Sequence, residues 1–84
     1  MTGCHPTAQD ARKGAMLCEL LRDKVKKDVG VMAADQIFWG LRPRGKVIII
    51  VKTNLVSLDY IRELANSFKN KVGVVTVGVV FEQT

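Results

Sequence analysis

Apolar residues along the chain fall into two kinds of pattern, which predict its strands and helices. Two short runs rich in β-branched residues are bounded by glycine or polar residues, namely Val47–Val51 and Val74–Phe81. Such runs are typical of buried strands. From Ser57 to about Lys71, apolar residues instead recur at helical spacing: Leu58, Ile61, Leu64, Ala65 and Phe68. We expect a strand, a helix whose Ile61 and Phe68 are buried, and a second, parallel strand.

A longer helix is predicted upstream of this unit, from Thr7 to about Val29. Thr7 is its expected N-cap and Gly30 its expected stop. Its apolar stripe consists of Ala11, Ala15, Cys18, Leu21, Val25 and Val29. We expect this stripe to pack on the sheet, with residues 7–84 forming a single domain and Met1–Pro6 a flexible tail.

The segment Val31–Leu41 allows two interpretations. A helix would place four residues on one face: Val31, Ala34, Phe38 and Leu41. However, Ile37–Trp39 has strand character, and Arg42–Gly45 has proline and glycine where a type I turn places them. We favour a strand over Gln36–Leu41, paired as a hairpin with Val47–Val51, because two parallel strands alone would make a very small sheet. The helical alternative, which gives an α/β sandwich, stays open.

The predicted fold is a two-layer α+β domain in the order α-β-β-α-β, with both helices on one face of a three-stranded mixed sheet. Nothing in this chain would then cover the second face of the sheet. Residues that alternate along the central and last strands give that face a largely apolar character and predict an interface on it: Ile48, Ile50, Thr76 and Val80. We expect a homo-oligomer or a stable protein partner to use it.

Charge directs attention to anionic partners. The chain carries 13 Lys and Arg against 8 Asp and Glu, a formal net charge of +5 and a sequence pI near 9.6. No apolar run approaches the roughly 20 residues that span a bilayer, and no signal-peptide pattern follows Met1. We therefore expect a soluble, cytoplasmic protein without a membrane partner. Charge alone does not choose between a nucleic acid and an acidic protein.

Few residues are placed to bind a metal or to perform catalysis. Cys4 and His5 fall in the predicted tail and Cys18 on a buried helical stripe, which is not the four-ligand spacing of a zinc site. Asp59 and Glu63 lie one turn apart on a helix surface, where a solvated pair is expected. The sequence predicts no metal, no cofactor and no enzyme.

The stretch Gly40–Lys46 reads GLRPRGK, which matches the first seven positions of the phosphate-binding pattern G-x-x-x-x-G-K-[ST]. The match fails at Val47, which has no hydroxyl to bind magnesium. A strand also follows where that chemistry needs a helix N-terminus. The stretch therefore does not predict nucleotide binding.

As a basic turn, the same stretch predicts binding of RNA. Single-stranded RNA is bound by positive charge beside exposed aromatic faces. Four residues are expected to contact phosphates: Arg42, Arg44, Lys46 and Lys52. Phe38 or Trp39 would stack on a base, since one of the two should face away from the helices. The predicted function is a non-catalytic RNA-binding module of a ribosome or other ribonucleoprotein; the alternative is a protein-assembly module.

The chain contains three segments in an order shared with known RNA-binding proteins. They are the run Gly40–Asn54, the helix containing Ile61 and Leu64, and the strand Val74–Val77. Residues 33–78 resemble the middle of the small ribosomal proteins and relatives that bind kink-turn RNA. The family's G-x-N-E-x-x-K stretch would fall on residues that do not match it: Ala33, Asp35, Gln36 and Trp39. The resemblance implies RNA binding without kink-turn specificity, and it supports the helical alternative for residues 31–41.

Overall fold

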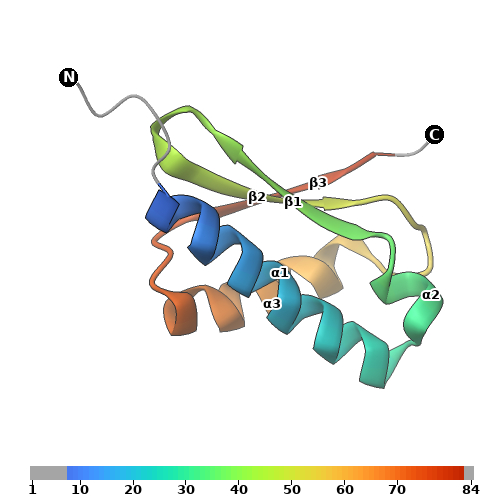
Figure 1. The fold of residues 1–84 in the computed structure, drawn as a ribbon. Coiled ribbons are helices and arrows are strands. Elements are labelled where there is room, and N and C mark those ends of the chain that lie inside the picture. Colours follow the sequence, from blue (N-terminus) through green and yellow to red (C-terminus); the bar gives the residue numbers. More distant parts are fainter. Residues whose placement is uncertain (1–7, 83–84) are drawn as a thin grey trace.

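Two long helices cover one face of a three-stranded sheet (Figure 1). The computed structural model describes residues 8–82, so the predicted tail Met1–Pro6 and the cap Thr7 lie outside the described residues. The helices are α1 (Ala8–Asp28), α2 (Val31–Ala34) and α3 (Leu58–Val72); the strands are β1 (Ile37–Arg42), β2 (Lys46–Val51) and β3 (Val77–Phe81). The predicted two-layer α+β fold is confirmed, with the short α2 as an addition.

Strand β2 is the centre of the sheet. It pairs antiparallel with β1, placing Trp39 opposite Ile49, and parallel with β3, placing Ile49 opposite Val79. Parallel neighbours require a crossover connection, which α3 supplies. The predicted hairpin and the predicted parallel pair are both present.

The segment Val31–Leu41 is divided between helix and strand. α2 ends at Ala34, and the backbone N–H of Lys52 then donates to the Gln36 carbonyl, which opens the ladder between β1 and β2. The segment is therefore helical for a single turn only, after which the chain pairs with β2. The interpretation of the whole segment as a helix is wrong, whereas the predicted strand agrees within one residue.

Two local predictions are corrected by backbone geometry. β3 begins at Val77, not at Val74, because Gly73 adopts a left-handed φ of 80° and the Val74 N–H donates to the Lys69 carbonyl, closing the end of α3. The turn between β1 and β2 is the 3-10 segment η1 (Pro43–Gly45), in which Arg44 has a φ of 69°. A type I turn has negative φ at that position, so the turn prediction is wrong.

The core lies between the two layers. Leu17, Leu21 and Val25 of α1 and Ile61 and Ala65 of α3 meet the buried side of β2, where Ile49 and Val51 are fully buried. Ile61 is buried as expected. Phe68 is only partly buried at the rim, with the Lys71 ammonium 5.2 Å from its ring centroid, so its predicted place in the core is wrong.

A glycine allows α1 to approach the sheet closely. A Cβ added at Gly14 would stand 2.5 Å from Cε3 of Trp39. No side chain fits in that space, so the indole ring packs directly against the helix backbone.

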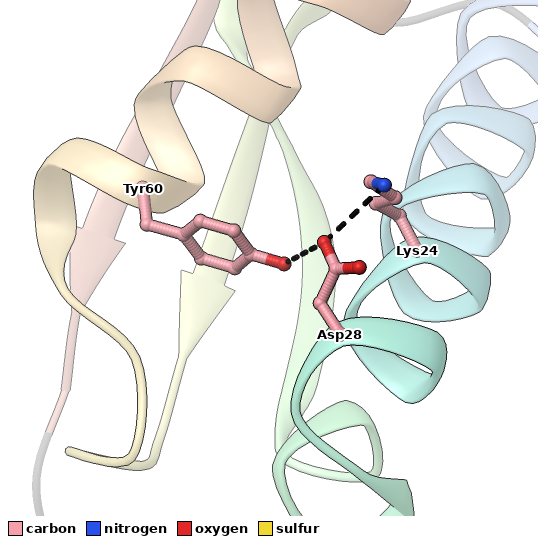
Figure 2. A network of polar contacts seen from close by, with 3 residues as sticks. All are labelled: Lys24, Asp28 and Tyr60. Carbon is pink, nitrogen blue, oxygen red and sulfur yellow. Dashed lines mark hydrogen bonds and ion pairs between the residues drawn. The ribbon is translucent and has the colours of Figure 1, made fainter.

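A polar network joins the end of α1 to the start of α3 (Figure 2). The Tyr60 hydroxyl donates to Asp28 Oδ2 at 2.9 Å, and the Lys24 ammonium lies 3.4 Å from the same oxygen. Partial burial and the hydrogen bond to the negative Asp28 carboxylate raise the pKa of Tyr60 to about 12. Ser57 caps the same end of α3 by accepting a hydrogen bond from the Tyr60 N–H at 3.1 Å.

The outer edge of β1 is held by α1. Arg22 Nε donates to the Ile37 carbonyl oxygen at 2.7 Å, and the Cys18 thiol lies 3.7 Å from the same oxygen. Burial raises the pKa of the Cys18 thiol, although the nearby Arg22 charge acts in the opposite direction. Cys18 is therefore a buried, protonated packing residue.

Candidate nucleic-acid interface

The face of the sheet turned away from the helices is not covered by any element of residues 8–82 (Figure 1). Side chains alternate along each strand, so the register defines which residues share this face. One row consists of Phe38, Ile50 and Val80, and the next of Gly40, Ile48 and Gly78. We call the surface formed by these six residues the open face.

The glycine row gives the open face a low, apolar centre. Ile48 lies between Gly40 and Gly78. Its Cγ1 is 3.5 Å from the position that a Cβ at Gly40 would occupy, and its Cγ2 is 3.4 Å from the corresponding position at Gly78. Ile48 thereby fills the space left by both glycines and is itself only 8% exposed.

Phe38 is the exposed aromatic residue of the open face. Its side chain is 38% exposed, and two cations lie over its ring: the Arg22 guanidinium carbon 5.5 Å from the centroid and the Lys52 ammonium 5.3 Å from it. Arg22 reaches this ring from α1 past the free edge of β1. Positive charge and an aromatic ring are thus combined at one end of the sheet.

Trp39, the other predicted stacking residue, belongs to the opposite side of β1. Its ring packs on Gly14, and its remaining exposure borders a groove of about 340 Å³ between α1 and the strand edge. The predicted separation of the two aromatics onto opposite sides is present, and Phe38 is the one on the open face.

The predicted phosphate contacts fall at both ends of the open face. Arg42 and Lys46 are opposite each other at the turn end, and Arg44 is exposed in η1 between them. Lys52 follows β2 at the other end, about 20 Å from Lys46 by strand rise. Arg42, Arg44, Lys46 and Lys52 are the only charged residues between Asp35 and Asp59. The hairpin is therefore uniformly positive.

The predicted interface residues divide in a similar way. Ile48, Ile50 and Val80 share the open face. Thr76 precedes β3 and is exposed beside the turn end, where it lines a different hollow.

Two residues near these sites were missed in the sequence. Arg22 is not among the predicted site residues, although it follows Leu21 and lies one turn after Cys18, at the border of the apolar stripe. That position could have indicated contact with the sheet. Lys13 extends to Gly73, with Nζ 3.8 Å from the position of an added Cβ. No pattern in the sequence indicates that Lys13 lies close to Gly73.

Residues 8–82 contain no group of three His, Cys, Asp or Glu side chains able to hold a metal ion. In the same range, no helix has both the length and the apolar composition needed to cross a bilayer. Comparisons of the chain with protein-family models, curated proteins and solved structures gave no match. A function must therefore be inferred from the geometry of the open face.

Proposed function

We propose that this protein binds single-stranded RNA on the open face, without catalysis, as part of a cytoplasmic ribonucleoprotein such as the ribosome. The observation that carries the proposal is Phe38, an exposed aromatic ring flanked by Arg22 and Lys52 on an uncovered sheet. A base that stacks on the ring places its phosphates near these two cations, which is the combination used by single-strand binders.

The dimensions of the open face suit a few nucleotides. Three strands of five or six residues present a surface of about 14 by 20 Å, or 280 Å². Sheet surfaces that bind single-stranded RNA stack about two or three bases. A stable protein interface instead buries about 800 Å² per partner, so the open face alone is too small for one.

Charge favours the same ligand. The hairpin contributes four cations and no carboxylate to the open face and its ends. Two copies packed through this face would bring like charges together, whereas a phosphate backbone neutralises them and releases its counterions.

Self-association through the open face is the second candidate, favoured by the apolar row of Phe38, Ile50 and Val80. It predicts a dimer at micromolar protein concentration in sedimentation velocity, and dissociation of that dimer by Ile50→Lys. A wild-type monomer that binds RNA would eliminate this candidate.

The RNA proposal is tested by titrating a short unstructured oligouridine against Phe38→Leu and against Val80→Ala. Phe38→Leu keeps apolar bulk but removes the stacking ring, so affinity should fall about tenfold. Val80→Ala alters the same face without touching an aromatic, and we expect less than a threefold loss.

The electrostatic part is tested by Arg42→Gln combined with Lys46→Gln. Two lost phosphate contacts should lower the slope of log affinity against log salt by about 1.4. Lys26→Gln combined with Lys27→Gln is the matched control, because both residues are exposed on α1 and the change in net charge is identical. Equal slopes in the two double variants would refute binding at the open face.

A further inference from the structure

A second hollow lies at the turn end of the sheet. It has a volume of about 420 Å³ and is built by three segments far apart in the sequence: the first turns of α1, the hairpin turn and the loop between α3 and β3. Its lining includes Lys13, Arg44, Lys46, Asp10 and Thr76. We call this hollow the turn-end pocket.

The turn-end pocket has an excess of positive charge. Three cationic side chains, Lys13, Arg44 and Lys46, line it against one carboxylate, that of Asp10, which leaves a formal excess of two. The Asp10 carboxylate is placed against the backbone of the turn, because a Cβ at Gly45 would collide with it. Lys13, about one turn further along α1, extends to Gly73 in the loop after α3. Cations on two walls suit a multiply charged anion.

The turn has an unusual backbone conformation. Arg44 and Gly45 both have left-handed φ values, 69° and 75°, and Arg44 is the only non-glycine residue with positive φ among residues 8–82. Such a conformation costs a residue with a Cβ about 1 kcal/mol or more and is found where a site needs it. Here it presents an arginine side chain at the rim of the pocket.

Lys46 connects the turn-end pocket to the open face, since it lines the pocket and pairs with Arg42 across the hairpin. From Phe38 to Arg42 the strand advances about 13 Å. A nucleic-acid strand that stacks on Phe38 and follows β1 towards the turn therefore reaches the pocket after a few nucleotides.

We propose that the turn-end pocket binds the terminal phosphate monoester of this RNA, an inference that rests on the proposed function. A monoester carries a charge of about −1.5 to −2 at neutral pH, matching the excess of two, whereas an internal diester carries one negative charge. The three walls also favour a chain end over a strand that continues.

The test compares one oligouridine in three forms: with hydroxyls at both ends, with a 5′-phosphate and with a 3′-phosphate. For the wild-type protein, a phosphate at the end that enters the pocket should strengthen binding about tenfold, the effect of one charge-assisted contact. Lys13→Gln and Arg44→Asn should each abolish that gain. Asparagine tolerates the left-handed φ of position 44, so the turn is kept.

Lys26→Gln is the matched control, since it has the same net charge as Lys13→Gln and lies about 20 Å further along α1. It should retain the gain from the terminal phosphate. An equal gain in Lys13→Gln and Lys26→Gln, or no gain in the wild-type protein, would overturn the inference while leaving the RNA proposal standing if the hydroxyl-ended oligomer binds.

A mononucleotide distinguishes failure of the pocket inference from failure of the RNA proposal. Uridine monophosphate should shift the backbone amide signals of Gly45 and Thr76 in an NMR titration, and uridine should not. If no oligomer binds but this difference is seen and is lost in Lys13→Gln, the pocket holds a phosphate monoester and only the RNA proposal fails. No oligomer binding and no difference between the probes would reject both.

Discussion

The two faces of the sheet are built from similar residues but have different surroundings. Ile49 and Ile50 are adjacent in β2 and chemically identical; Ile49 is fully buried under the helices, whereas Ile50 is partly exposed on the open face. The apolar character of a strand thus serves the core at one residue and a surface at the next. The hydrophobicity of a residue in this strand therefore does not show whether the residue lies in the core or on the open face.

The largest expected effect comes from truncating these two isoleucines separately. Ile49→Ala should lower the free energy of unfolding by about 3 to 4 kcal/mol, because it leaves a cavity between α1, α3 and the sheet. Ile50→Ala should cost only about 1 kcal/mol, since no layer covers it. Urea unfolding followed by the fluorescence of Trp39, the single tryptophan, measures both. Equal losses would show that something covers the open face in solution.

A pair of glycines tests the same contrast with smaller changes. At Gly14 a Cβ would stand 2.5 Å from the Trp39 ring, whereas at Gly40 the nearest atom, Ile48 Cγ1, would be at an ordinary 3.5 Å. Gly14→Ala should therefore destabilise by about 1 to 2 kcal/mol despite the better helix propensity of alanine. Gly40→Ala should change stability by less than about 0.5 kcal/mol. A stabilising Gly14→Ala would mean that α1 can move away from the sheet without loss.

The smallest expected effect lies within the helix layer, at the contact between Tyr60 and Asp28. The pKa of Tyr60 is raised from its usual value near 10 to about 12 in the folded protein, so the folded state holds this proton more tightly. Burial of the hydroxyl and its hydrogen bond to the Asp28 carboxylate both favour the protonated form. Their combined contribution to stability is fully present below pH 10 and is lost as the pH rises towards 12. The loss should be small because the pair is exposed.

Tyr60 is the single tyrosine, so the ultraviolet absorbance of tyrosinate reports its ionisation directly. Asp28→Asn removes the negative charge beside the hydroxyl and should lower the titration midpoint towards 10. An unchanged midpoint would show that the hydrogen bond does not persist in solution.

The fold was largely predictable because its signals are local. Ser57 and Gly73 bound α3 as a cap and a left-handed stop should, and the two β-branched runs form neighbouring strands. Counting apolar faces also predicted an uncovered side. What failed depends on tertiary contacts: Phe68 has helical spacing but lies at the rim, and Val74 has strand composition but turns into the core after α3 ends.

The candidate site was predictable only in part, for the same reason. The basic turn and the opposite orientation of Phe38 and Trp39 follow from sequence alternation. The roles of Arg22 and Lys13 depend on where α1 crosses the strand edge and the loop after α3. Helix periodicity predicts on which side of the helix a charged residue lies. It does not predict which residues of other elements that side chain contacts.

The contact between Arg22 and Ile37 also bears on aggregation. β1 is an edge strand, and the Ile37 carbonyl points away from β2, because the preceding carbonyl of Gln36 already accepts from Lys52 and backbone groups alternate. This is one of the acceptors that a strand from another molecule would use to extend the sheet. The Arg22 side chain already donates a hydrogen bond to this acceptor, and it places a positive charge at the edge of the sheet. A strand from another molecule that used this acceptor to extend the sheet would first have to break that bond.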